Sequence, residues 1–525
     1  MSETQRFIDE TVAQWRTLAR DYALADWDMA IAGTPEANER STAAQAAYMR
    51  FWSDPERFAT ARRLHEAGAA SPDVARQLKL IYLSAAENQQ DEASIERITQ
   101  LEAKVRDIYT NYRAEVGGQS LSDNELDDLL TTSTDSALVQ EAWEASKKVG
   151  QQVAALVREL AQARNAPARQ QGYRDFFQRQ LVLNEIDEDQ LFSLFGELEQ
   201  ATDAPFQALK AELDADRAQR FGLAPGQVQP WHYGDRFFQQ PPPDLGGVDM
   251  DRIFAEKDPV VLSLATFDGL GLEVGDIVER SDLYPRPGKN QHAFCTDIDR
   301  EGDVRTLNNL QPNHRWNETL LHELGHAVYD KYQDRRLPWV LRGPPHTLTT
   351  EAIAILMGSL TYDAEWLSQI VGVPPAEAAA LAAAGQAQQR AVRLIFTRWV
   401  LVMTHAERAL YADPDSDLDS LWWDLVERYQ LLSRPAGRAA PDWAAKIHIA
   451  LYPVYYHNYE LGHLITAQLQ DYLRRHAGGL VGRKAAGAWL VEQFFRPGNR
   501  ADWAAHIATA TGEALTTRYF VEALR

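Results

Sequence analysis

The fold and the chemistry of this chain are decided by the stretch NETLLHELGHAVYD, residues 317–330. Its apolar residues recur at the spacing of one helix face, which predicts a helix over about residues 317–332 with one buried side. His322 and His326 are four residues apart and share a face of that helix, so both imidazoles can bind one Zn²⁺. Glu323 projects beside them, where it can take a proton from a metal-bound water. The alternative is coincidence: with 13 histidines in the chain, chance alone produces such a pentapeptide in about 2% of comparable sequences.

A catalytic zinc ion needs a third protein ligand, because such sites typically hold three ligands and a water. The segment LTTEAIA, residues 348–354, indicates the start of a second helix, with Thr349 or Thr350 as its N-cap and Glu351 in its first turn. Taken alone, a first-turn Glu is more often a partner of the helix dipole than a metal ligand. Because this Glu follows the histidine pair and lies on an otherwise apolar helix, we interpret it as the third ligand of one zinc ion per chain.

Working outward from the motif, the sequence predicts a mainly α fold with one small sheet. Helical periodicity is lost between residues 282 and 310. Two β-compatible runs, 292–298 and 304–307, flank the polar segment 299–303 and predict a hairpin. Amphipathic helices are expected on both sides of it.

The length of 525 residues corresponds to three or four average domains or to one large helical fold. Gly117 and Gly118 interrupt the helical pattern. We therefore expect an N-terminal helical region, 1–115, and a catalytic region, 116–525.

The composition excludes several classes of protein. Lys and Arg number 53 against 75 Asp and Glu, and the net charge of −22 repels nucleic-acid phosphates and anionic membranes, so neither is an expected partner. The single cysteine, Cys295, cannot form an intrachain disulfide, and the first residues lack an apolar signal core. The most apolar stretch, 392–403, contains two arginines and is too short to span a bilayer. We expect a cytoplasmic protein.

Several separate stretches resemble, in order, the angiotensin-converting-enzyme (peptidyl-dipeptidase A) family of zinc metallopeptidases, including its soluble bacterial members. The likeness spans roughly residues 120 to 525. The matching stretches are AWE at 142–144, RN through AR to GY between 164 and 173, HA at 292–293, HELGH at 322–326, LP at 337–338 leading to EAI at 351–353, and KIH at 446–448 with a tyrosine-rich segment after it.

The resemblance implies a gluzincin-type fold, in which two helical lobes surround a deep active-site cleft and a small antiparallel β-sheet lies near the zinc. The N-terminal region would cap this cleft. By the same resemblance His322, His326 and Glu351 are zinc ligands, and Glu323 is the general base and later the proton donor to the leaving amine. Other residues would contact the substrate: Tyr459 at the oxyanion, His292 and His448 at the peptide backbone, Ala293 along an extended strand, and Lys446 and Tyr456 at the C-terminal carboxylate.

The tyrosine assignment can be examined from the residues themselves. Tyr456 and Tyr459 are three apart and so are neighbours on one helix face. Without the zinc motif, tyrosines at this spacing more often pack in a core, His448 would be a structural histidine, and Lys446 would be solvated. One extra residue before the tyrosines leaves Tyr455 as an alternative to Tyr456.

The chain also departs from the family pattern. Asn458 stands where an arginine usually binds chloride. Ile355 stands where an acidic residue usually orients a ligand histidine, so either another acceptor orients that histidine or the site binds metal less tightly. The carboxylate-binding glutamine of the family has no clear counterpart. The segment 459–469 also resembles the thermostable carboxypeptidase Taq family, and the tyrosine spacing resembles thimet-type oligopeptidases.

The expected activity is removal of C-terminal dipeptides from oligopeptides. An oligoendopeptidase or a metallocarboxypeptidase would use the same metal and base. A third alternative is a non-catalytic zinc-bound peptide-binding protein, although such a protein has no need of the base.

Overall fold

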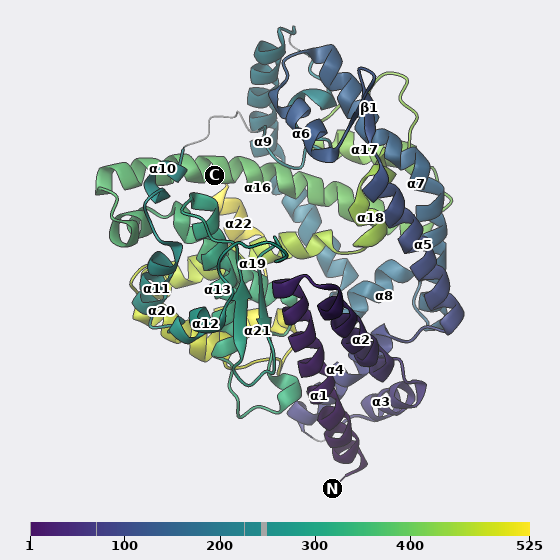
Figure 1. The fold of residues 1–525 in the computed structure, drawn as a ribbon, viewed down its shortest axis with the longest axis vertical. Helices are drawn as coiled ribbons and strands as arrows, with labels where there is room; N and C mark the ends of the chain where they lie inside the picture. The colour runs from purple at the N-terminus through teal and green to yellow at the C-terminus, as the bar shows by residue number, and fades with distance from the viewer. Residues whose placement is uncertain (1, 70, 225, 243–248, 525) are drawn as a thin grey trace. The chain divides into compact units, whose positions relative to one another are not determined.

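The computed structural model describes residues 2–69, 71–224, 226–242 and 249–524. These residues form α-helices and two small two-stranded antiparallel sheets, which confirms the predicted mainly α fold (Figure 1). The chain divides into two compact units. The first unit is Met1–Gln89, Val248–Gly385 and Leu461–Tyr519, and the second unit is Gln90–Gly247, Gln386–Glu460 and Phe520–Arg525.

The first unit contains the N-terminal helices, the second hairpin and the helices that follow it. Proline occupies the first turn of α2, α3 and α4, where its missing N–H costs nothing. The elements are α1 (Glu3–Ala32), α2 (Pro35–Trp52), α3 (Pro55–Ala67), α4 (Pro72–Glu87), α10 (Asp251–Phe254), α11 (Pro259–Leu270), α12 (Gly275–Arg280), β3 (Phe294–Asp297), β4 (Val304–Leu307), α13 (His314–Lys331), α14 (Thr347–Gly358), α15 (Ala364–Trp366), α20 (Lys484–Trp489) and α21 (Trp503–Thr511).

The second unit contains the two longest helices that lie within one unit, α7 and α9. Its elements are α5 (Glu92–Asn111), β1 (Ala114–Val116), β2 (Gln119–Leu121), α6 (Asp123–Thr132), α7 (Ser136–Gln170), α8 (Phe176–Leu183), α9 (Glu188–Phe221), α17 (Leu418–Gln430) and α18 (Ile447–Leu451). Three helices have residues in both units: α16 (Pro375–Ala412), α19 (Tyr456–Ala477) and α22 (Arg518–Ala523).

The hairpin predicted at 292–298 and 304–307 is confirmed. Strand β3 pairs antiparallel with β4, with Phe294 opposite Leu307 and Asp297 opposite Val304. Helix α1 supports this hairpin from one side: Trp27 packs against Ile298 and Leu307, and its ring is 6.0 Å from that of Phe294. The N-terminal helix is therefore part of the first unit's core.

The break predicted at Gly117 and Gly118 is a tight turn between β1 and β2, in which both glycines have positive φ. Each compact unit is assembled from separated segments, whereas the regions 1–115 and 116–525 are consecutive. That division, and the capping role of the first region, stay predictions.

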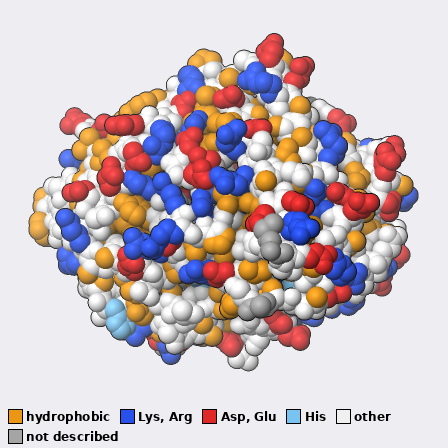
Figure 2. Space-filling view, turned by 90° about the horizontal axis from the view of Figure 1, so that it is seen from below, with side chains coloured by type: hydrophobic (Ala, Val, Ile, Leu, Met, Phe, Trp, Pro, Cys, Tyr) orange, Lys and Arg blue, Asp and Glu red, His pale blue; other side chains and the backbone are white. Residues whose placement is uncertain are grey.

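Charge is mixed on the surface despite the net excess of acids. On the face drawn in Figure 2, Lys and Arg side chains are interspersed with Asp and Glu side chains. Within the part of the chain that the structure describes, no helix combines the length and the apolarity needed to cross a membrane.

Candidate active site

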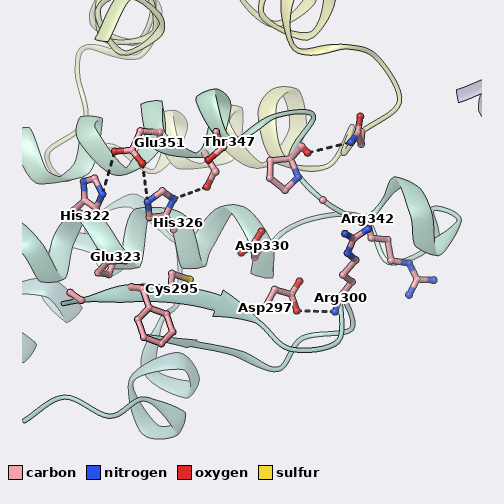
Figure 3. A pocket seen from close by; sticks show the side chains of 16 residues that line it. Cys295, Asp297, Arg300, His322, Glu323, His326, Asp330, Arg342, Thr347 and Glu351 are labelled. Carbon is pink, nitrogen blue, oxygen red and sulfur yellow. Dashed lines mark hydrogen bonds and ion pairs between the residues drawn. The ribbon is translucent and has the colours of Figure 1, made fainter. Parts of the chain in front are cut away.

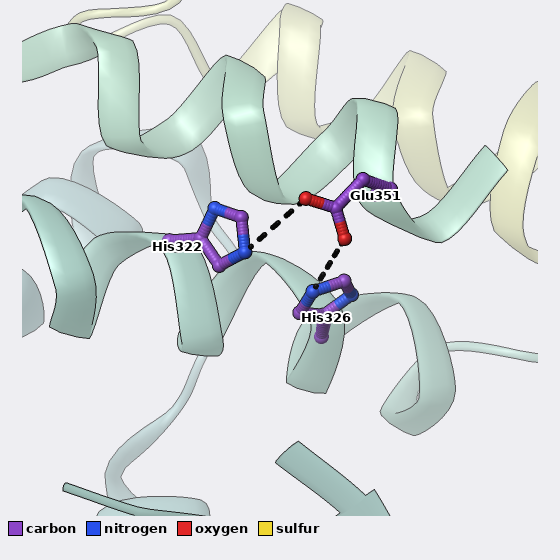
Figure 4. A group of neighbouring side chains, drawn as sticks. All are labelled: His322, His326 and Glu351. Carbon is purple, nitrogen blue, oxygen red and sulfur yellow. Dashed lines mark ion pairs between the residues drawn. The ribbon is translucent and has the colours of Figure 1, made fainter. Parts of the chain in front are cut away.

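The metal motif lies on α13, which begins earlier than predicted, at His314. Asn313 caps the helix, because its side-chain oxygen accepts the N–H of Trp316 at 2.9 Å. His322 and His326 point from one face of this helix toward Glu351 of α14 (Figure 4). The prediction that the two histidines share a helix face is confirmed.

The three side chains form a compact set of metal donors. Glu351 Oε1 lies 3.5 Å from His322 Nε2, and its Oε2 lies 3.5 Å from His326 Nε2. One ligand atom from each residue lies within 4.8 Å of the others. Burial lowers the pKa of His322 to about 4, which leaves its imidazole in the neutral, metal-binding form. Two imidazoles and a carboxylate at this spacing fit a zinc ion with one position left for water.

The N-cap predicted for the second helix is wrong. Helix α14 begins at Thr347 and is capped by His346, whose Nδ1 accepts the N–H of Leu348 at 3.1 Å. Glu351 therefore lies in the second turn. His346 can cap the helix because its backbone is extended, with φ −158° and ψ 160°. The hydroxyl of Thr349 does not cap the helix and donates to the His346 carbonyl at 2.8 Å.

Thr350 has a different role from the predicted cap. Its hydroxyl lies 2.8 Å from Nδ1 of His326. With Nε2 on a metal, Nδ1 carries the proton and donates to this hydroxyl, which fixes the ring orientation. Because Ile355 stands in place of an acid, the sequence did not show which group orients a ligand histidine. Thr350 is that acceptor for His326.

Gly325, inside the motif, allows the two ligand helices to approach closely. A Cβ at this position would lie 2.8 Å from the Cα of Ala354 and 3.0 Å from the carbonyl of Ile353. Real side chains do not tolerate such contacts. The glycine therefore lets α14 lie against α13, which brings Glu351 within reach of the histidines.

Glu323 faces a pocket of about 630 Å³ that is lined by residues of the first unit (Figure 3). Its side chain is 6% exposed and accepts no hydrogen bond from the described residues. Burial raises the pKa of this carboxyl to about 7. Ala293 also lines the pocket, just before β3, and the exposed His292 precedes it.

Two further acids line the same pocket, Asp297 on β3 and Asp330 on α13 (Figure 3). Burial raises the pKa of both carboxyls, and repulsion from Asp297 adds to the rise at Asp330. No pattern in the sequence predicted either residue as part of the site.

The remaining predicted residues, Lys446, His448, Tyr456 and Tyr459, belong to the second unit. The His448 and Tyr456 rings are 5.2 Å apart, and the Tyr456 and Tyr459 rings are 5.6 Å apart. Tyr456 is buried, whereas Tyr459 is 36% exposed. The second unit thus brings these four residues together, as the first unit does for the metal ligands.

Lys446 has a partner that the sequence did not reveal. Its ammonium donates to Gln239 Oε1 at 2.8 Å and lies 5.8 Å from the centre of the Tyr456 ring. It forms no salt bridge with a described acid. Burial lowers its pKa to about 8. Gln239 is therefore the glutamine that the structure places beside Lys446.

The two ends of the chain resemble different peptidase families. Residues 1–210 match the family model for angiotensin-converting enzyme, and residues 275–525, which include all three metal donors, match the model for peptidase family M3. Both matches are to zinc metallopeptidases, and the chain is a zinc metallopeptidase. A search of the curated proteins finds no match.

These matches confirm the family resemblance at the level of a zinc metallopeptidase with peptide substrates. The N-terminal part of the chain matches one family and the C-terminal part matches another. The family M3 match covers the helices that carry the metal donors. The cleavage mode therefore depends on how the substrate is held.

Proposed function

We propose that this metallopeptidase releases C-terminal dipeptides from oligopeptides. The observation that carries the proposal is Lys446, a cation that is 8% exposed and forms no salt bridge with a described acid. The Asp235 carboxylate offsets the burial of this charge only in part. A buried charge without an ion pair is unfavourable, so such a residue is expected where a ligand brings the opposite charge. The free carboxylate at the end of a peptide is an anion of suitable size.

The neighbours of Lys446 support this assignment. Gln239 holds the ammonium through its carbonyl oxygen. Its amide donates one hydrogen bond to Asp235 Oδ2 at 3.3 Å, which leaves the second amide hydrogen for a carboxylate. Tyr456 lies next to the ammonium, with its hydroxyl as a further donor. Tyr456 is buried whereas Tyr455 is 40% exposed, which favours Tyr456 over the alternative.

The proposed chemistry gives each residue one task. His322, His326 and Glu351 would hold the zinc ion, one per chain, which when bound lowers the pKa of a coordinated water and polarises a carbonyl. Glu323 takes the proton of the attacking water and delivers it to the leaving amine. Tyr459 donates its hydroxyl to the oxyanion that develops on the attacked carbonyl.

The other predicted residues would hold the substrate. His292 and His448 hydrogen-bond its backbone, and Ala293 pairs with it along the edge of β3. The N-terminal region would limit entry to short peptides, and peptide turnover in the cytoplasm is the setting that we propose.

The test is mass spectrometry of the products from two N-blocked peptides that differ only in a free or an amidated C-terminus, each with and without a zinc chelator. We expect chelator-sensitive loss of two residues from the free acid alone. Loss of one residue would indicate a metallocarboxypeptidase.

One rival is an oligoendopeptidase, because the tyrosine spacing also resembles that of thimet-type oligopeptidases. Internal cuts in both peptides would establish that rival and remove Lys446 from substrate binding. Zinc content of one ion per chain without turnover on a broad peptide panel would indicate a peptide-binding protein.

A further inference from the structure

The pocket beyond the metal donors is lined by two carboxyls, Asp297 and Asp330, whose ionised form is disfavoured by burial and would be favoured by a bound cation. Neither Asp297 nor Asp330 forms a salt bridge with a described Lys, Arg or His. Asp297 Oδ1 accepts the N–H of Asp299 at 3.2 Å and that of Arg300 at 2.8 Å. Asp330 accepts one long bond, 3.4 Å, from the amide of Gln333. Each carboxylate therefore keeps an oxygen without a partner.

The two arginines that line this pocket are held by other groups. The Arg300 guanidinium lies 4.6 Å from the centre of the Trp339 ring. Arg342 donates to the Leu337 carbonyl at 2.8 Å and to the Glu301 carboxylate at 3.4 Å. Neither forms a salt bridge with the two aspartates, although the Arg300 charge lowers the pKa of both carboxyls. A cation from the substrate could therefore still pair with them.

The edge of β3 points to a ligand independently of the charge. Ile298 N–H donates to the Asp303 carbonyl at 2.9 Å, so in this register the backbone groups of even-numbered residues of β3 face β4. Those of Ala293, Cys295 and Asp297 face away from β4, and these three residues line the pocket. An extended peptide can add to such an edge.

The edge also fixes a direction for the peptide. A strand that adds antiparallel to β3 runs with its amino-terminal residues toward Asp297 and its carboxy-terminal residues toward Ala293.

Glu323, nine-tenths buried and without a hydrogen-bond partner among the described residues, faces the same pocket. The reacting group and the two free aspartates thus lie along one continuous cavity (Figure 3).

We propose that Asp297 and Asp330 form a subsite for a lysine or arginine side chain of the substrate, on the amino-terminal side of the cleaved bond. This inference rests on the proposed function, because it presumes that a peptide occupies the pocket. A charged hydrogen bond in a partly dry site discriminates strongly against an uncharged analogue.

The first test compares N-blocked peptides that carry lysine or norleucine at one position, moved stepwise through the residues before the cleaved bond. Blocking removes the α-amino group as a competing cation. At one position we expect kcat/KM to favour lysine by about tenfold or more. Asp297→Asn and Asp330→Asn should each reduce this ratio severalfold.

A matched control is Glu279→Gln, which removes an exposed acid of the first unit that does not line the pocket. It should keep both the lysine preference and the wild-type rates. A wild-type enzyme that shows no lysine preference at any position, or a preference that survives in both aspartate variants, would overturn the proposal.

The second test does not require turnover. Cys295 is the only cysteine and lines the pocket on β3, so a cationic and an anionic methanethiosulfonate of similar size label a single site in the zinc-loaded enzyme. The ratio of their rates reports the local potential, because the reactivity of the thiol cancels. We expect the ratio to favour the cation and to fall about fivefold to tenfold in the doubly substituted variant.

Protection of Cys295 by peptides completes this test. A lysine peptide should slow labelling at a lower concentration than its norleucine partner, even if the chain proves to bind peptides without cleaving them. An unchanged rate ratio in the aspartate variants, or equal protection by both peptides, would exclude the subsite. Failure of dipeptide release with this protection intact would overturn the proposed function alone.

Discussion

The two units contain ionisable side chains of opposite sign that form no salt bridge with a described residue. In the first unit Asp297 and Asp330 line the pocket beside the metal donors without a salt bridge. In the second unit Lys446 is buried and forms no salt bridge with a described acid. Proteins seldom leave buried charges unpaired unless a ligand supplies the partner. On our two proposals, one unit recognises a cation and performs the chemistry, while the other recognises an anion.

The largest effect is expected at Glu323, which tests whether the chemistry belongs to the first unit. Glu323→Gln should keep the zinc content and lower kcat by about 10³-fold, because it removes the proton acceptor and not a ligand. Steady-state kinetics with metal analysis checks this. Undiminished hydrolysis with zinc retained would contradict the assignment.

Tyr459 tests whether the second unit contributes to the chemical step as well as to binding. Tyr459→Phe should lower kcat by about 10²-fold, the scale for one oxyanion donor. Tyr452→Phe, at a residue that is 52% exposed, is the control and should have no effect. An unchanged kcat for Tyr459→Phe would restrict the second unit to substrate binding.

Lys446→Gln should raise KM for free-acid peptides by about 10-fold to 100-fold, because a carboxylate loses a charged hydrogen bond in a buried site. Cleavage of amidated peptides should change little. Lys104→Gln removes an exposed cation of the same unit and should leave KM unaltered. Equal effects on both kinds of peptide would mean that Lys446 supports the fold and not the carboxylate.

Gly325→Ala should reduce the free energy of unfolding by about 1–3 kcal/mol and weaken zinc binding, because the added Cβ pushes α14 away from α13. Denaturant unfolding and chelator competition measure the two effects. In Gly196→Ala of α9 the new methyl group meets nothing within 4 Å; this control should stabilise the second unit slightly. Wild-type zinc affinity in Gly325→Ala would mean that metal binding does not depend on the close packing of α13 against α14.

The smallest effect is a pH dependence. Burial lowers the pKa of Lys446 to about 8, so the ammonium is present below that pH and is lost as the pH rises through it. We expect kcat/KM for free-acid peptides to fall above pH 8 by up to about tenfold per unit, and that for amidated peptides to lack this component. Lys446→Arg should shift the fall to higher pH, because the guanidinium stays charged. The same profile for both peptides would assign the titration to another group.

The sequence predicted those parts of the site that depend on short-range periodicity. The spacing of His322 and His326 fixes their helix face, and the loss of periodicity near residue 292 located the hairpin. The cap at His346 was missed because an imidazole rarely takes this place, and its backbone geometry depends on tertiary contacts. Gln239 was missed for another reason: 207 residues separate it from Lys446, and no local pattern marks such a pair.

The positions of the metal donors have a consequence for how the enzyme acquires its zinc. All three lie between residues 322 and 351, on two helices of one unit, so the loop that a bound ion closes is short and the entropic cost of closing it is small. The ligand helix α14 also depends on a later segment, because the Thr466 hydroxyl of α19 donates to the Ala352 carbonyl at 3.0 Å. The donors are thus close together in sequence, yet the unit that surrounds them is complete only when the last part of the chain has been made.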